Sequence, residues 1–325
     1  MRRLAHLSAA LLLVLAGCGT FAQPGPGSIP FALIGDAPYN TLEVDEVDHL
    51  IDALNAQDLA FVIHVGDITA GHGSCSDAWF EARKRQFERS RHPFVIVPGD
   101  NDWVDCHRSG RDPLERLDFF RKVFESGDES LGAQKIRLER QSSSQSKDRR
   151  FPEYREHMRW IAGDVLFVGV NVQGSNNNVG RNRAMDREAE RRMAAVFDWL
   201  DEAVKIVEQR NLRGLVVFAQ ADPDFEMSVR RRPGVPDGWE SFRNVLRAHA
   251  LYLGKLNKPV LFVHGDRHHF VYDHPLADAK GKTIANFTRV EVWGSPFVRW
   301  IKAWIDPKAP EVFGVTPATS PAPAN

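Results

Sequence analysis

Four apolar runs in this chain end in the dipeptide Gly-Asp, and this repeated ending limits the possible folds more than any other feature. The runs FALIGD, FVIHVGD, FVIVPGD and VLFVHGD end at Asp36, Asp67, Asp100 and Asp266. Short continuous apolar runs bounded by turn residues are typical of buried strands. Glycine permits a sharp turn after each strand, so we expect the aspartates at the edge of a sheet rather than in its core.

Amphipathic segments alternate with these strands. TLEVDEVDHLIDALN, DAWFEARKRQFER and DPLERLDFFRKVFE carry apolar residues at helical spacing, as does a longer segment over residues 187–211. Alternation of strands and helices favours parallel strands joined by crossover helices. The runs DVLFVGVNV, GLVVFAQ and TRVEVWG add strands towards the C-terminus and suggest a second, mixed sheet. The pattern therefore predicts an α/β protein.

The N-terminus predicts a targeting segment. Arg2 and Arg3 precede an apolar run that is short for a membrane span and ends in LAGC at Cys18. LAGC is similar to the bacterial lipobox, in which the cysteine is lipidated; the alternative is an ordinary signal peptide with a chance cysteine. We expect export to the periplasmic side of a bacterial membrane, and the absence of an aspartate directly after Cys18 favours the outer membrane.

These features divide the chain into four parts. We expect a lipoprotein signal peptide at 1–18, a flexible Gly/Pro/Ser tether at 19–28, one folded domain at 29–307 and a disordered Pro/Ala/Thr-rich tail at 308–325. Within the domain, the polar and basic stretch from Leu138 to Trp160 is either a solvated insertion or a lid over an anionic substrate. The formal net charge of −1 argues against nucleic acid as a partner.

The cysteines agree with export. If Cys18 carries a lipid, Cys75 and Cys106 remain as an even pair, which can be oxidised in an exported protein. Cys75 follows the Asp67 strand and Cys106 follows the Asp100 strand. A disulfide would join these two loops if the strands are neighbours, and the alternative is two free thiols.

Aspartates gathered at one edge would repel one another unless positive charge lies between them. Two divalent cations that share one bridging carboxylate would use the whole set. In HGDRHHF, a turn can direct Asp266 and His268 towards one centre, whereas the role of His264 stays open. His64 is interpreted as a core residue, and His72 lies in a glycine-rich loop that can reach the site.

The ordered motifs DAP, VGD, PGDND and HGDRH resemble those of the calcineurin-like metallophosphoesterase superfamily, in an exported branch with variant metal motifs, over roughly residues 30–270. The resemblance implies a two-layer mixed β-sandwich flanked by helices (αββα), two metal ions and hydrolysis of a phosphoester by metal-bound hydroxide. It implies metal ligands at these positions: Asp36, Asp67 as the bridge, Asp100, Gln220 with Asp222 as a nearby substitute, Asp266 and His268.

The motifs depart from the superfamily pattern in three places. DAP lacks a histidine, Gln220 replaces an imidazole, and Asn101 stands where the superfamily has the histidine that assists the leaving group. Asn101 can donate a hydrogen bond but not a proton. The oxygen-rich ligand set suits Mn²⁺, Mg²⁺ or Ca²⁺ better than Zn²⁺, and the resemblance also allows Fe.

The leading hypothesis is a metal-dependent hydrolase of a small phosphate mono- or diester, with catalytic roles for Asn101, His268 and Arg267. Arg267 and Arg108 can stabilise developing negative charge, or form ordinary surface ion pairs. His269 and His72 are possible substitutes for the missing acid. The segment from Ser175 to Asn178 either lines the pocket or forms a plain turn. The alternatives are a catalytically degenerate envelope lipoprotein that binds metal or an anion, and a structural lipoprotein without metal.

Overall fold

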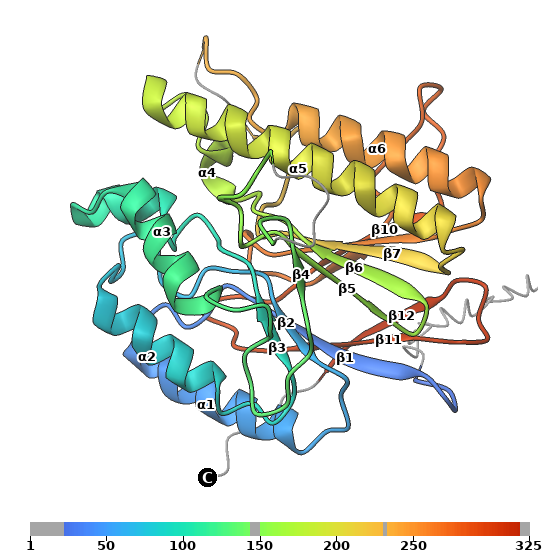
Figure 1. Ribbon diagram of the computed structural model, residues 1–325, viewed down its shortest axis with the longest axis horizontal. Helices are drawn as coiled ribbons and strands as arrows, with labels where there is room; N and C mark the ends of the chain where they lie inside the picture. Colours follow the sequence, from blue (N-terminus) through green and yellow to red (C-terminus); the bar gives the residue numbers. More distant parts are fainter. Residues whose placement is uncertain (1–22, 144–149, 230–232, 319–325) are drawn as a thin grey trace, which may run out of the picture.

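A computed structural model describes residues 23–143, 150–229 and 233–318 of the chain. Two β-sheets pack face to face, and helices cover their outer faces (Figure 1). The predicted αββα sandwich is therefore confirmed. Residues 1–18, with Cys18, lie outside the described residues. Within the described ranges, no helix is both long and apolar enough to cross a membrane.

The first sheet has five strands in the order β12-β11-β1-β2-β3. The strands β1, β2 and β3 are parallel, whereas β11 and β12 run antiparallel at one edge. Helices α1, α2 and α3 lie on the outer face of this sheet (Figure 1). The bounds are β1 Ile29–Ile34, β2 Val62–His64, β3 Phe94–Ile96, β11 Ile301–Ile305, β12 Phe313–Pro317, α1 Thr41–Asn55, α2 Asp77–Phe87 and α3 Pro113–Phe124.

The second sheet has seven strands in the order β4-β5-β6-β7-β8-β10-β9. Its centre, from β6 to β10, is parallel, and both edges are antiparallel. Helices α5 and α6 cover its outer face (Figure 1). The bounds are β4 Glu139–Arg140, β5 Met158–Ala162, β6 Val165–Gly169, β7 Gly214–Phe218, β8 Val260–His264, β9 Val271–Asp273, β10 Phe287–Glu291, α4 Gly174–Asn177, α5 Arg183–Gln209, α6 Glu240–Lys255 and the 3₁₀ helix η1 Val104–Ser109.

Apolar side chains fill three layers, one between the sheets and one under each set of helices. Strands that are buried on both faces have continuous apolar sequences. The four strands that precede the Gly-Asp pairs therefore show no alternation of apolar and polar residues. Between the sheets, Phe61 stacks on Phe31 at 5.2 Å and meets Phe167 edge-on at 5.0 Å. This central layer holds the two sheets in a fixed relation, so the loops that follow their strands meet in fixed positions.

The predicted disordered tail is wrong for part of its length. Residues 313–317 form β12, an edge strand that pairs with β11 and places Val315 opposite Ala303. Val312 and Val315 are buried, and a side chain on Gly314 would overlap the indole of Trp304. The Pro/Ala/Thr-rich composition concealed this short apolar segment. The described domain therefore extends beyond the predicted boundary at 307.

Candidate active site

The strands that precede the four aspartates lie in both sheets. Asp36, Asp67 and Asp100 follow the adjacent parallel strands β1, β2 and β3, and Asp266 follows β8 of the second sheet. Gln220 follows β7, the neighbour of β8. All five residues therefore lie at the carboxyl ends of parallel strands, which is where functional groups gather in α/β sheets.

The glycines of the Gly-Asp pairs make room for the aspartates of neighbouring pairs. A Cβ on Gly99 would overlap the carboxylate of Asp67, and a Cβ on Gly265 would overlap that of Asp36. A Cβ on Gly174, which precedes the predicted Ser-Asn segment, would meet the carboxylates of both Asp100 and Asp266. The recurrent glycine therefore serves the close approach of carboxylates as well as the turn.

Four non-glycine residues of the site have left-handed backbone conformations. The φ angles are 49° at Asp36, 59° at Asp67, 84° at Asp266 and 68° at His268. Such conformations are unfavourable for residues with a side chain and persist only where the surrounding structure enforces them. Their concentration at one edge of the sandwich is typical of a functional site.

Hydrogen bonds hold the Asp67 carboxylate from three directions. Asn101 donates its backbone N–H to Asp67 Oδ1 at 2.9 Å. The Tyr39 hydroxyl and Gln220 Nε2 each donate to Asp67 Oδ2 at 3.1 Å. The backbone N–H of Asp67 donates in turn to Asp102 at 2.9 Å. Asp67 is therefore fixed in orientation.

The Gln220 amide connects the two sheets. Its Nε2 donates to Asp67 and, at 3.2 Å, to Asp266 Oδ1, while its Oε1 accepts the Gly174 N–H at 2.6 Å. The N–H of Asp266 lies 3.2 Å from both carboxylate oxygens of Asp36. Asp36, Asp67 and Asp266 are thus linked through one amide and one backbone N–H, as expected if the predicted ligands converge.

His268 presents a defined nitrogen to this cluster. Its Nδ1 lies 2.8 Å from the carbonyl oxygen of Ser295, which can only accept, so Nδ1 carries the proton. In the neutral ring, Nε2 then carries the lone pair, and it lies 2.9 Å from the Tyr39 hydroxyl and 3.9 Å from Asp36 Oδ1. An imidazole fixed in this way is suited to bind a metal through Nε2.

Burial and mutual repulsion raise the pKa values of Asp36, Asp67 and Asp266. Burial is the largest cause for Asp36 and Asp67, whose pKa values lie well above the ordinary value, followed by the charges of Asp266 and Asp100 respectively. Burial, with the charge of Asp100, raises the pKa of Asp266 to about 8. Within the described ranges, no Lys or Arg forms an ion pair with Asp36, Asp67, Asp100 or Asp266.

The cluster is a gathering of carboxyl groups rather than a completed coordination sphere. Among the described residues, no three His, Cys, Asp or Glu side chains form a group that could hold a metal ion. The Gln220 amide nitrogen and the Tyr39 hydroxyl lie among the carboxylates and supply hydrogen bonds there. The chemistry of the donor set fits hard divalent cations, which prefer oxygen ligands.

The two predicted arginines occupy different environments. Arg267 forms ion pairs with Asp222 and, at 3.3 Å, with Asp224, so its charge is already balanced. Arg108 pairs with Asp105 at 2.7 Å. A Cβ on Gly71 would lie 2.7 Å from the Arg108 guanidinium and 2.9 Å from Asn101 Oδ1, so these two groups face the same small space.

The remaining predicted residues lie at different depths. His64 is buried and lies 3.0 Å from the Ala37 carbonyl oxygen, which confirms its interpretation as a core residue. His264 is also buried, and its Nδ1 lies 2.8 Å from the Gly265 carbonyl oxygen. His72 and His269 are exposed, with His269 3.7 Å from Glu291. Neither exposed histidine has a contact with the aspartate cluster among those described.

Sequence reasoning missed several residues that build the site. Tyr39 accepts a hydrogen bond from Asn101 Nδ2 at 3.2 Å and contacts Asp67 and His268, although only its position near Asp36 hinted at this. Asp102 accepts the N–H groups of Asp67, Ile68 and Gly99. Its position at the end of the PGDND motif could have identified it as a site residue from the sequence.

Asp105 and Arg181 were also missed. Asp105 lies between Arg108 and Arg181, which is 3.8 Å away, and accepts the Ser175 hydroxyl at 3.0 Å. Burial raises the pKa of Asp105 to about 6, with Asp100 as the next cause. The rim beside Asn101 therefore carries two arginines that share one carboxylate, which leaves an excess of positive charge.

The predicted disulfide between Cys75 and Cys106 is confirmed. It joins the loop after β2 to the 3₁₀ helix after β3, with 5.8 Å between the Cα atoms. These two segments also carry Asp67, Asn101 and Asp105. The bond therefore ties together the two loops that supply one half of the site.

No protein-family model and no curated protein matches the sequence. Among solved structures, a dimetal phosphatase from Danio rerio is similar, with 14% identity, a TM-score of 0.49, and 86% of this chain and 93% of that chain covered. A purple acid phosphatase from yellow lupin (Lupinus luteus) seeds is similar with 11% identity and a TM-score of 0.51. That alignment covers 90% of this chain, which spans about half, 53%, of the lupin protein. The chain has the fold of the calcineurin-like metallophosphoesterases.

Proposed function

We propose that this chain is a metal-dependent hydrolase of small phosphoesters. The observation that supports the proposal best is the cluster of Asp36, Asp67, Asp100 and Asp266, which have no Lys or Arg partner within the described ranges. Burial and neighbouring charges raise the pKa values of Asp36, Asp67 and Asp266. Burying uncompensated carboxylates is costly unless a cation offsets their charge. The similar solved structure from yellow lupin seeds is named a purple acid phosphatase.

The proposed ligands of two divalent cations are Asp36, Asp67, Asp100, Gln220, Asp266 and His268. Bound divalent cations supply Lewis-acid chemistry to phosphoryl oxygens. Gln220 would have to turn its carbonyl oxygen towards a cation, which reverses its present hydrogen bonds to Asp67 and Gly174. The oxygen-rich set favours Mn²⁺ or Mg²⁺ over Zn²⁺.

The chain's own residues would bind and orient the substrate. The guanidinium groups of Arg108 and Arg181 at the rim suit a phosphoryl group, for which arginine is a strong partner. Asn101 Nδ2 is directed into the site by its hydrogen bond to Tyr39 and would donate to a substrate oxygen. Because Asn101 cannot supply a proton, substrates with good leaving groups, such as aryl phosphates, should react best.

The test combines metal analysis with turnover. Purified protein loaded with Mn²⁺ should hydrolyse an aryl phosphate mono- or diester, contain about two metal ions per chain, and lose turnover after chelation. Asp67→Asn should lower metal content and turnover together, because it removes a charge that both cations would share. Folded protein that contains metal but shows no turnover with Mn²⁺, Mg²⁺ or Fe would contradict the enzymatic proposal.

A second candidate, a binding protein without catalysis, is favoured by a separate observation. The Gln220 amide already bridges Asp67 and Asp266, the Tyr39 hydroxyl is bonded to Asp67, and Asn101 replaces a potential proton donor. Stoichiometric metal or phosphate binding without turnover would support this alternative. Absence of both would contradict both candidates.

We also propose that the protein is exported and anchored through lipid at Cys18. The disulfide between Cys75 and Cys106 supports an oxidising compartment. Mass spectrometry of the N-terminal peptide from bacterially expressed protein should find a lipid on Cys18. The Cys18→Ala variant should leave the membrane fraction, and a variant that stays there as fully as the wild type would argue against the anchor.

A further inference from the structure

A second cavity lies at the edge of the sandwich opposite the aspartates. Ala60 and Phe61 line it and precede β2, whereas Asp67 follows that strand. Arg210 also lines it and precedes β7, whereas Gln220 follows that strand. The cavity has a volume of about 570 Å³, within the usual range for small-molecule sites.

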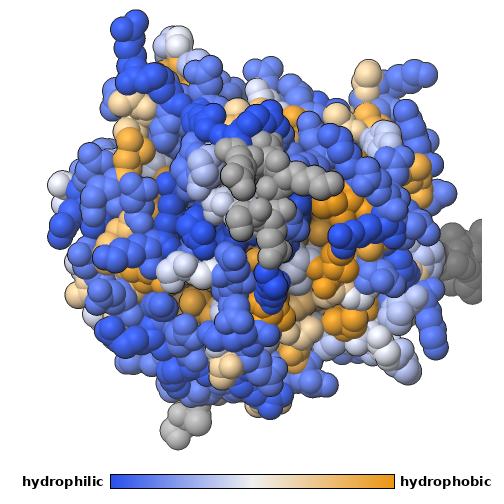
Figure 2. Space-filling model, in the orientation of Figure 1, coloured by the Kyte–Doolittle hydropathy of each residue, from blue (hydrophilic) through white to orange (hydrophobic). Residues whose placement is uncertain are grey.

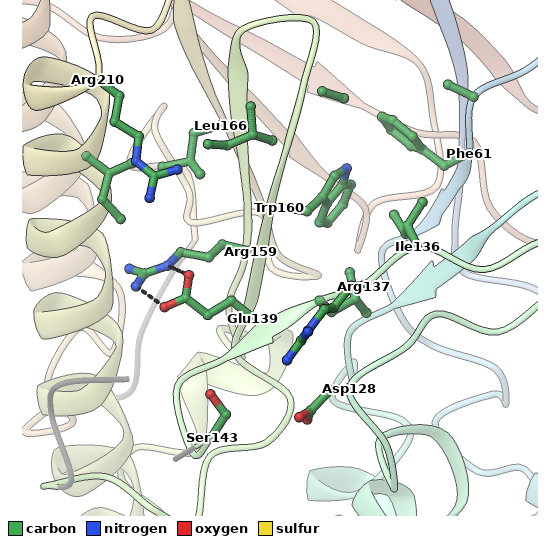
Figure 3. A pocket seen from close by; sticks show the side chains of 15 residues that line it. Phe61, Asp128, Ile136, Arg137, Glu139, Ser143, Arg159, Trp160, Leu166 and Arg210 are labelled. Atoms are coloured by element: carbon green, nitrogen blue, oxygen red, sulfur yellow. Dashed lines mark hydrogen bonds and ion pairs between the residues drawn. The ribbon is translucent and has the colours of Figure 1, made fainter. Parts of the chain in front are cut away.

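The floor of this cavity is apolar and rigid. Trp160 stacks on Phe167 at 5.0 Å and meets Phe61 edge-on at 5.3 Å, so its indole is held in place. Ile136 and Leu166 extend the apolar lining, with Trp160 and Phe61 (Figure 3). A floor of this kind suits an aliphatic chain or an aromatic ring.

The Trp160 indole also contains an unpaired hydrogen-bond donor. The side chain lines the cavity and is only 8% exposed, and its Nε1 has no hydrogen-bond partner within the described ranges. A buried Trp N–H usually has an acceptor, because leaving it unpaired costs free energy.

The charges around the cavity are unequal. Glu139 is paired with Arg159 (Figure 3), and Asp128 is paired with Arg155 at 3.2 Å. Arg137 and Arg210 also line the cavity and form no ion pair with any described residue. Figure 3 shows Arg210 reaching in beside α5, while Arg137 lies on the other side below Trp160. Two unbalanced cations therefore flank the apolar floor.

We infer that this cavity binds an amphiphilic organic anion, a molecule with a carboxylate or phosph(on)ate head and an apolar body. The head would pair with Arg137 or Arg210, and the body would cover Trp160. An inorganic anion would leave the apolar floor in water, and a neutral lipid would leave both arginines without a partner. This inference does not depend on the phosphoesterase proposal.

The test measures binding to the full chain by titration calorimetry. Decanoate and decylphosphonate, kept below their critical micelle concentrations, probe the two head groups; decanol and acetate lack the charge and the apolar body, respectively. At least one of the two anions should bind saturably at one site, and more tightly than decanol or acetate. The tighter of the two identifies the head group, and neither is a phosphoester that the proposed hydrolase could cleave.

Variants connect the binding to this cavity. Arg137→Gln with Arg210→Gln should weaken binding on the order of tenfold, since charge-assisted contacts are lost. Trp160→Phe should weaken it while keeping the stacking, and Arg187→Gln, an exposed arginine outside the cavity, should have no effect. Matching thermal melts would show that the variants fold.

Three results would overturn the inference. Neither anion binds saturably, decanol binds as tightly as the tighter of the two anions, or the double arginine variant binds that anion as tightly as the wild type. Turnover of an aryl phosphate is measured separately and should be the same in all these variants, so a failure of the proposed function would not be mistaken for a failure of this site.

Discussion

At the scale of single residues, the site shows how side chains of the same type acquire different roles. Asp67 and Asp102 are both buried, but Asp67 accepts side-chain donors within the cluster, whereas Asp102 is occupied by three backbone N–H groups. Arg108 and Arg267 likewise differ, because Arg267 has two carboxylate partners and Arg108 shares one with Arg181. Local partners, rather than residue type, decide which group is available to a substrate.

This difference leads to a prediction. Arg108→Gln should lower kcat/KM for an aryl phosphate by roughly ten- to a hundredfold, because it removes a donor for the phosphoryl group, and should leave metal content unchanged. Arg267→Gln serves as the matched control and should have the smaller effect on kcat/KM. Steady-state kinetics with metal analysis of both variants would check this. A larger loss in the Arg267 variant would reverse the assignment.

At the scale of elements, short strands position the site and tertiary pairing stabilises them. β2 and β3 each span only three residues. They position Asp67 and Asp100 because β2 is paired with β1 on one side and with β3 on the other. The disulfide joins two residues with a sequence separation of 31. Because it restricts the unfolded chain, it should contribute about 3–4 kcal/mol to the free energy of unfolding. The disulfide and the hydrogen bonds to neighbouring strands thus hold these short strands in place.

The edge strand β12 provides an element-scale prediction. A chain that ends after Val312 should lose stability on the order of 3 kcal/mol, because it exposes the surface that Val315 and the β11 ladder cover. A chain that ends after Ala318 keeps the whole strand and should melt like the full chain. Chemical denaturation of both chains would test this. Equal stability of the two would mean that β12 contributes nothing.

At the scale of the whole molecule, buried neutral histidines connect stability to pH. His64 lies in β2 and His157 directly precedes β5; both are buried, and burial lowers the pKa of each from 6.5 to about 4. Between pH 6.5 and 4 the unfolded state takes up a proton on each histidine and the folded state does not. Stability therefore rises with pH in this window and is lost as pH falls through it.

The expected slope is about 1.4 kcal/mol per pH unit for each such histidine. His157→Gln should reduce the slope of the free energy of unfolding against pH by about 1.4 kcal/mol per pH unit, whatever its effect on stability at pH 7. His49→Gln, at an exposed histidine, should leave the slope unchanged. Urea denaturation at several pH values between 4.5 and 7 would measure these slopes, and equal slopes in all three proteins would refute the account.

The sequence by itself determined much of the fold, the disulfide and the places of the aspartates. Continuous apolar runs ending in Gly-Asp indicate buried parallel strands whose turns carry polar groups, and this is a local property that a linear pattern records. The sequence also indicated that His64 is a core residue. It did not reveal β12, because a strand at the edge of a sheet is stabilised mainly by its partner, here β11.

Only the tertiary structure decided which groups meet. Tyr39, Gln220 and Asp266 lie far apart in sequence, and their contacts exist because two sheets pack with one set of strand ends together. The same packing pairs Arg267 with Asp222 and leaves Arg108 beside Asn101. It also forms the second cavity at the opposite edge. Hydrogen bonds and ion pairs act over a few ångströms, so they depend on spatial neighbours that the order of residues does not specify.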